Sequence, residues 1–396
     1  MLFDPPSHEP LTEERWSESR AKRAILDIVD ESEAAFDEER LWPPHPLDEI
    51  DPKEPPLTSL YFGASGVIWA LDALTRAGLS APSRDWTDVV LALVEDYRAA
   101  PDFAELTGGS VPSFWMGEAG ILLLAHRLAP ASWQEDRLLT AVHANVENPF
   151  CELMWGSPGT MLAARAMFER TGREAFAEAW RESATWLLDE WREDLWLQQL
   201  YGRPVRVLGP AHGFAGNVYA LTSGELLDSA RRREVEHRAV AAAVKYAQRD
   251  GALAQWPASL EPRPERSPEI RTQWCHGAPG IVATLAGIAT ANDEFTDLLV
   301  AGGQLVWTAG PLVKGPGLCH GTAGNGYAFL KLFERTRDEL WLSRARAFAM
   351  HAIEQVDRAR SKHGRGRFTL WTGDLGTALF LASCIEASAG MPTLDC

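Results

Sequence analysis

The chain has 396 residues, 46% of them hydrophobic, and a formal charge of −17 at pH 7. A chain this acidic lacks the basic face that sequence-independent binding to nucleic acid or to an anionic membrane requires. Its five cysteines are too few and too scattered for a disulfide scaffold, and no apolar run is long enough to span a bilayer. We therefore expect a cytoplasmic protein with reduced thiols, some of them on a metal.

The first 59 residues predict one helix, residues 21–36, followed by an extended lead-in rich in proline. No second domain is indicated. We expect residues 1–59 to pack on a single helical barrel that spans residues 60–396.

From residue 60 onward the signal Gly-x-x-Gly recurs seven times, each time followed directly by an apolar run. The copies begin at Gly63, Gly117, Gly156, Gly213, Gly277, Gly321 and Gly373. Their spacing of roughly fifty residues is typical of repeat architectures. The second glycine of each copy lets neighbouring helices approach closely.

The apolar runs predict helices that are buried on all sides. Between them lie charge-rich amphipathic stretches, such as residues 173–191 and 338–356, which predict outer helices with one wet face. Strand signals are weak: alternating β-branched runs are short and isolated, and no Asn-Gly or Asp-Gly hairpin lies between two such runs. The fold class predicted is all-α, an α/α toroid: a seven-fold double-helix barrel with inner and outer rings.

The residue before the first glycine distinguishes the copies. In chain order it is Phe62, Met116, Trp155, His212, His276, His320 and Thr372. Cys275 and Cys319 each precede one of these histidines, and equivalent positions of adjacent repeats come close at one end of a ring. Zinc binds thiolate and imidazole, and three protein ligands leave its catalytic position open. The pattern predicts such a site from the two cysteines and one of His276 or His320, without choosing between them.

Three motifs carry a resemblance to a known family. The segments AHGFAG (211–216), WCHGAPG (274–280) and GLCHGTAGNGYAFL (317–330) resemble those of the lanthionine synthetase C-like family. The succession of all seven glycine motifs is similar to that family's seven-fold barrel. The resemblance implies zinc held by Cys275, Cys319 and His320. This zinc would activate a thiol for addition to a dehydroalanine or dehydrobutyrine.

The resemblance also implies roles beside the metal. His212 matches the family's acid/base histidine, and a side chain that titrates near neutrality suits proton delivery to the acceptor. Arg271 and Trp274 match an arginine and a tryptophan just ahead of the first zinc cysteine. Arg271 is suited to stabilise an enolate or a carboxylate, and Trp274 to line the substrate cleft. Lys314, five residues before Cys319, is a candidate to hold an acidic substrate.

Two departures from the peptide-cyclizing members point to glutathione as the thiol donor. Those members carry tyrosine after the first zinc cysteine, where this chain has His276, as the glutathione-binding eukaryotic-type members do. They also carry an acid just upstream of the second glycine motif. Residues 113–116 are not acidic here, and the nearest acid is Glu118 within the motif. His276 and Glu118 are therefore candidate substrate-binding residues.

The sequence favours a zinc enzyme that forms thioethers, because the predicted site leaves one metal position open. Its expected partners are a small thiol such as glutathione and a peptide or protein containing a dehydroamino acid. Two other functions stay open. One is a zinc-stabilised glutathione-binding or scaffold protein with little turnover, and the other is a lanthipeptide cyclase with a dedicated precursor peptide.

Overall fold

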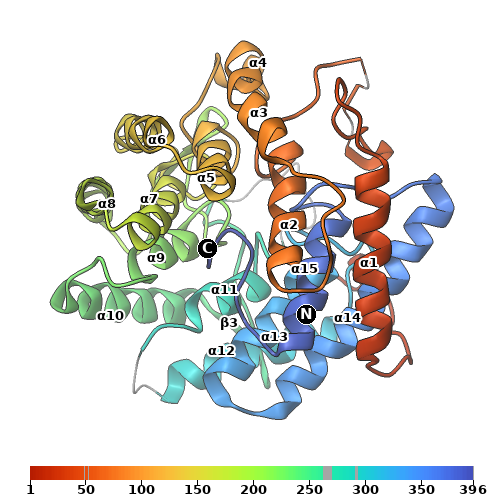
Figure 1. The fold of residues 1–396 in the computed structure, drawn as a ribbon. Coiled ribbons are helices and arrows are strands. Elements are labelled where there is room, and N and C mark those ends of the chain that lie inside the picture. Colours follow the sequence, from red (N-terminus) through yellow and green to blue (C-terminus); the bar gives the residue numbers. More distant parts are fainter. Residues whose placement is uncertain (49, 52, 262–269, 290–292, 396) are drawn as a thin grey trace.

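The computed structural model describes residues 1–48, 50–51, 53–261, 270–289 and 293–395. These residues form fifteen α-helices, two 3-10 helices at Pro5–Ser7 and Pro46–Asp48, and four short strands (Figure 1). The predicted predominance of helix is confirmed. None of the described helices is long and apolar enough to cross a membrane.

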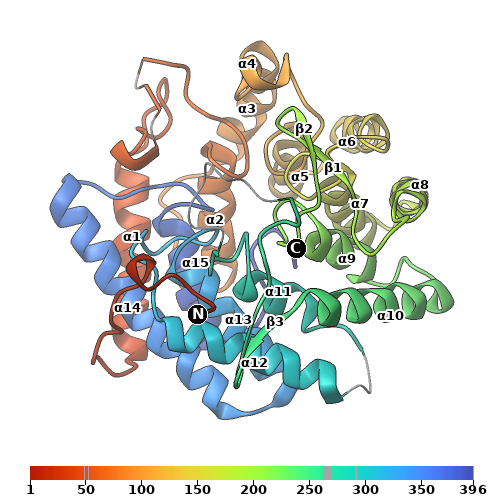
Figure 2. The ribbon, with the colours of Figure 1, turned by 180° about the vertical axis from the view of Figure 1, so that it is seen from behind.

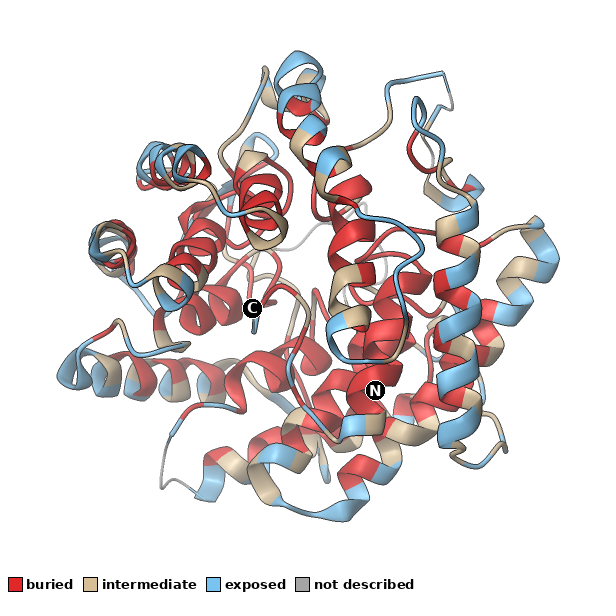
Figure 3. Ribbon diagram, viewed as in Figure 1, coloured by how far each residue is buried: buried red, intermediate tan, exposed pale blue. Residues whose placement is uncertain are grey.

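Each glycine motif starts a helix, and its first glycine is the N-cap residue. The seven helices are α2 (Ala64–Arg76), α5 (Glu118–Leu128), α7 (Ser157–Thr171), α9 (Phe214–Thr222), α11 (Ala278–Leu285), α13 (Thr322–Thr336) and α15 (Asp374–Glu386). Each contacts the next in chain order, and α15 contacts α2. The seven helices therefore form a closed ring, and most of their residues are buried (Figure 3).

The second glycine of each motif lies where backbone from the preceding loop passes close by. A Cβ at Gly280 would lie 1.8 Å from the carbonyl oxygen of Trp274 and 2.6 Å from the ring of Pro210, which belongs to the preceding repeat. A Cβ at Gly216 would meet the Pro210 carbonyl oxygen at 2.1 Å. Glycine is required because any side chain would push each loop off its own helix and off its neighbour.

Seven amphipathic helices lie outside this ring and turn one face to solvent (Figure 3). They are α1 (Glu18–Ala34), α3 (Thr87–Ala99), α6 (Ser132–Ala144), α8 (Glu174–Glu190), α10 (Ser229–Tyr246), α12 (Asp293–Ala309) and α14 (Glu339–His363); the short α4 (Ala104–Thr107) follows α3. Helix α1 begins three residues before the predicted start because the Ser17 hydroxyl accepts a hydrogen bond from the Arg20 amide. It packs against α14 and α15, near the end of the chain.

Two short hairpins precede α9 and α11. Strands β1 (Gln198–Leu200) and β2 (Arg203–Val205) pair antiparallel, as do β3 (Gln248–Asp250) and β4 (Leu253–Gln255). The weak strand signals gave no indication of the β3–β4 hairpin, whose turn residues are Gly251 and Ala252. Strand β3 is exposed and polar, so it lacks the apolar alternation by which a strand is predicted. The hairpin depends on its turn, where Gly251 has a positive φ of 59°.

The segment after α15 lies in the middle of the ring in both ribbon views (Figures 1 and 2). The Trp115 indole donates to the Thr393 hydroxyl at 3.1 Å, and the Arg165 guanidinium donates to the Leu394 carbonyl at 2.8 Å. The Lys331 ammonium pairs with Asp395 at 3.1 Å. The C-terminal segment is thus tied to α7, to α13 and to the loop before α5.

Candidate metal centre

The loops that lead into α11 and α13 bring the two Cys-His pairs together. The Cys275 amide donates to the Cys319 carbonyl at 3.0 Å, and the Cys319 amide donates to the Trp371 carbonyl at 2.8 Å. Both cysteines are buried and His320 is half-buried. The two sulfur atoms and one ring nitrogen of His320 lie within 4.8 Å of one another. Three ligand atoms so close together can bind one ion.

The chemistry of these donors fits zinc. Two sulfurs and one imidazole nitrogen are ligands that zinc prefers, and they leave one tetrahedral position for an exogenous ligand. The hydrogen bond between the two thiols, in which Cys319 is the donor, holds the pKa of Cys275 well below its ordinary value. One sulfur of the pair is therefore readily deprotonated, as a metal ligand must be.

The sequence left open which histidine completes the group. Among the described residues it is His320 that joins the two cysteines, and not His276. The His276 ring stacks on the His212 ring instead, with 6.1 Å between centroids. Burial lowers the pKa of His276 to about 4, which keeps its imidazole neutral at physiological pH.

His212 forms a hydrogen-bonded pair with Glu152. Its Nδ1 donates to Glu152 Oε2 at 2.9 Å, and the Glu152 carboxylate is fully buried. That carboxylate also accepts the backbone amides of Met154 at 3.0 Å and Trp155 at 2.7 Å. Burial alone would lower the pKa of His212, but the hydrogen bond and charge of Glu152 outweigh it and raise this pKa. The imidazole is therefore poised to carry a proton near neutral pH.

The model of the family described as "Lanthionine synthetase C-like protein" matches residues 51–392. The chain belongs to this family.

Two curated relatives each match about half of this lanthionine synthetase C-like chain. It is 30% identical over 204 residues to "Glutathione S-transferase LANCL1" of Danio rerio, covering 50% of this chain and 47% of that protein. It is 33% identical over 181 residues to "LanC-like protein GCL1" of Arabidopsis thaliana, covering 43% and 39%. The chain thus spans less than half the length of either curated relative.

A solved structure shares the fold. Nisin cyclase superposes with a TM-score of 0.58 at 15% identity, over 93% of this chain and 99% of that one. This likeness concerns the fold alone.

The other predicted residues of this lanthionine synthetase C-like protein occupy different places. The Arg271 guanidinium is close enough for its charge to act against protonation of both His212 and His276. Trp274 is fully buried between Trp115 and Trp371, at centroid distances of 6.0 and 4.8 Å.

Two further candidates are held by neighbouring side chains. Lys314 Nζ donates to Gln273 Oε1 at 3.3 Å. Glu118 forms an ion pair with Arg137 of α6, so its carboxylate is turned toward an outer helix. Contact of these residues with a substrate stays a prediction.

Sequence reasoning missed three residues of this centre. Glu152 holds His212, Gln273 Nε2 donates to Cys275 Sγ at 3.0 Å, and the Tyr61 hydroxyl hydrogen-bonds Cys319. Only Glu152 had a usable signal, because it is an acid four residues ahead of the third glycine motif. Gln273 and Tyr61 belong to no repeated pattern.

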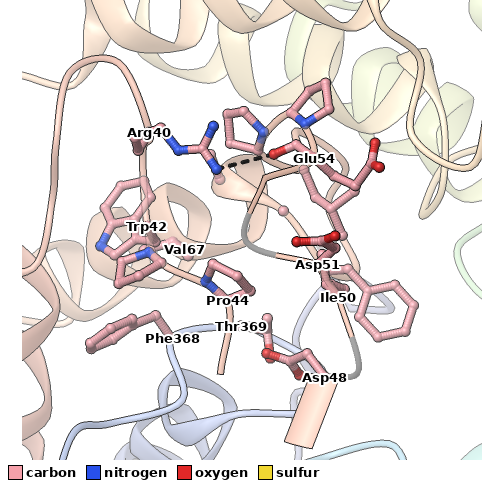
Figure 4. A pocket seen from close by; sticks show the side chains of 17 residues that line it. Arg40, Trp42, Pro44, Asp48, Ile50, Asp51, Glu54, Val67, Phe368 and Thr369 are labelled. Atoms are coloured by element: carbon pink, nitrogen blue, oxygen red, sulfur yellow. Dashed lines mark hydrogen bonds between the residues drawn. The ribbon is translucent and has the colours of Figure 1, made fainter. Parts of the chain in front are cut away.

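A cavity of about 210 Å³ lies between the N-terminal lead-in and the starts of α2 and α15 (Figure 4). Trp42, Phe62, Val67 and Phe368 give it apolar walls. The Arg40 guanidinium donates to the backbone carbonyl of Glu54 at 3.1 Å across its rim. Phe62, one of the lining residues, directly follows Tyr61, whose hydroxyl hydrogen-bonds Cys319.

Proposed function

We propose that this protein forms thioethers by adding a thiol, preferably that of glutathione, to a dehydroalanine or dehydrobutyrine in a peptide or protein. The observation that carries the proposal is the Cys275–Cys319–His320 group with the His212–Glu152 pair beside it. A seven-fold α/α toroid explains their proximity, because it gathers the starts of all seven inner helices at one end. Family membership and the name of the zebrafish relative support the same reading.

Cys275, Cys319 and His320 would hold zinc. Zinc bound there lowers the pKa of a coordinated thiol, so that the substrate thiol is a thiolate at neutral pH. The two cysteine ligands keep the site electron-rich, and their burial excludes water from it.

His212 would supply the proton that the addition needs. The new C–S bond forms at the β-carbon of the acceptor, and the electrons of its double bond move to the α-carbon, which must be protonated. Because Nδ1 of His212 is bonded to Glu152, Nε2 is the atom left to face the acceptor. The proton lost by the thiol replaces the one that His212 donates, so the reaction is a net addition with no other reactant.

Arg271 and Lys314 would recognise negative charge. Arg271 lies beside His212 and is suited to stabilise the enolate oxygen that develops on the acceptor. Lys314 is exposed to solvent, is linked to Cys275 through Gln273, and is suited to a carboxylate of glutathione. The apolar cavity lined by Phe62 would receive a side chain of the acceptor peptide.

The test is incubation of the zinc-loaded protein with glutathione and a dehydroalanine peptide, followed by mass spectrometry. We expect a protein-dependent product whose mass is the sum of the two substrates. A glutathione-binding or scaffold protein would bind the thiol and give no adduct above buffer. A cyclase would close a ring within a peptide that holds both cysteine and dehydroalanine, without a change in mass and with loss of the free thiol.

A further inference from the structure

Each of the two cysteine sulfurs receives a hydrogen bond from a side chain outside the ligand group. Gln273 Nε2 donates to Cys275 Sγ at 3.0 Å, and the Tyr61 hydroxyl donates to Cys319. Gln273 and Tyr61 are buried, with exposed fractions of 6% and 3%. In this environment, water does not compete strongly for the donors.

Lys314 fixes the orientation of the Gln273 side-chain amide. Lys314 Nζ has only protons to donate, so the amide oxygen must face it and the amide nitrogen must face the sulfur. The Gln273 backbone is also held, because its amide and carbonyl both bond to His276, at 3.0 and 2.9 Å. Lys314, Gln273 and Cys275 thus form a directed chain of hydrogen bonds.

Tyr61 is held by the same loop that supports Cys319. Its backbone amide donates to the Trp115 carbonyl at 2.9 Å, and its ring stacks on Trp371 at 5.7 Å with 7° between the planes. The Trp371 carbonyl in turn accepts the Cys319 amide. Donor and sulfur are therefore positioned by one common support.

The proposed metal site needs such donors. Zinc with two cysteine thiolates, a neutral imidazole and a substrate thiolate carries a net charge of −1 in a buried place. Hydrogen bonds to sulfur spread this charge and reduce its donation to the metal. We propose that Gln273 and Tyr61 are positioning residues that set the charge density on the two zinc-bound sulfurs, with Lys314 orienting Gln273. The inference rests on the proposed zinc site and is separate from the acceptor chemistry.

The experiment compares Gln273→Leu, Tyr61→Phe and Lys314→Met in the full-length protein. Zinc affinity is measured by competition with a chelator, and the sulfur-to-metal charge-transfer band is recorded after replacement of zinc by Co²⁺. We expect the first two variants to weaken zinc binding roughly tenfold, because the buried net negative charge of the occupied site then lacks a donor that stabilises it. Their band should move to longer wavelength, because a sulfur without its donor is more electron-rich. Lys314→Met should shift the band in the same direction, by less.

Two buried residues elsewhere provide matched controls. Gln134→Leu on α6 removes a buried amide, and Tyr97→Phe on α3 removes a hydroxyl that bonds Val111. Both should keep the wild-type affinity and spectrum.

Wild-type affinity and spectrum in the Gln273 and Tyr61 variants would overturn the inference. If Gln273→Leu does not fold, an unchanged charge-transfer band in both Tyr61→Phe and Lys314→Met would overturn the inference. No acceptor is used, so a protein that fails to form thioethers still gives the spectra. A protein that forms thioethers with unaltered spectra in these variants rejects this inference alone.

Discussion

Glu152 and His212 come from successive repeats, and their side chains meet in a 2.9 Å hydrogen bond beside the cysteine site. The Glu152 carboxylate is fully buried and accepts hydrogen bonds from two backbone amides, so its position is fixed independently of His212. The ring of repeats thus joins two side chains from loops that are remote in sequence.

The first prediction concerns the pH dependence of this pair. If His212 delivers the proton, as proposed, activity is present below its pKa and is lost as the pH rises through it. Glu152→Gln removes the charge that raises this pKa and leaves burial, which lowers it. The alkaline loss of kcat/KM should therefore move to lower pH, as measured by a pH–rate profile.

A matched control for this variant is Glu182→Gln. Glu182 bonds His143 at 2.7 Å on the outer surface, where both side chains are exposed. This variant should keep the wild-type profile. An unchanged profile in Glu152→Gln would mean that His212 does not deliver the proton.

The second prediction concerns the metal. Cys275→Ala or Cys319→Ala should remove bound zinc, because a three-ligand site loses most of its affinity with one thiolate gone. Cys384→Ala is the control: Cys384 is equally buried, on α15, and belongs to no ligand group among the described residues. Elemental analysis measures the outcome, and full zinc in either of the first two variants would show that the ligands are misassigned.

The third prediction concerns stability. Burial raises the pKa of Asp374, in the first turn of α15, to about 6. The folded protein therefore binds more protons than the unfolded chain between about pH 4 and pH 6, and the free energy of unfolding falls as the pH rises through this window. The loss amounts to at most about 3 kcal/mol.

Asp374→Asn should remove this slope, because asparagine does not titrate. The fold should be kept, because the asparagine oxygen can still accept the hydrogen bond that the Arg367 amide donates to Asp374 at 3.1 Å. Denaturant unfolding at several pH values measures the slope. Asp88→Asn, at an exposed first-turn position of α3, should leave it unchanged. An equal slope in wild type and Asp374→Asn would contradict the prediction.

The fourth prediction concerns the cavity. Val67→Phe should fill part of its volume of about 210 Å³. If a side chain of the acceptor peptide occupies this space, KM for peptide acceptors should rise severalfold while zinc content stays the same. A minimal acceptor without neighbouring side chains should react as before, and an equal rise in KM for both acceptors would argue against the cavity's role.

The fold was predictable where the sequence signal is local and repeated. A glycine directly ahead of an apolar run marks all seven inner helix starts, and two Cys-His pairs in register indicated the metal group. The choice of His320 over His276 needed the three-dimensional path of the loops. Gln273 and Tyr61 could not be predicted, because no repeated sequence pattern marks a side chain that will donate a hydrogen bond to a cysteine sulfur.

The contact between α1 and α15 has a consequence for biogenesis. Residues 18–34 must wait for residues 374–386 before their shared interface can form, so the ring closes only when almost the whole chain has left the ribosome. Until then the apolar faces of α1 and α2 remain without their final partner. Synthesis of this protein therefore passes through an open arc of repeats with exposed apolar surface, and such intermediates are prone to aggregate.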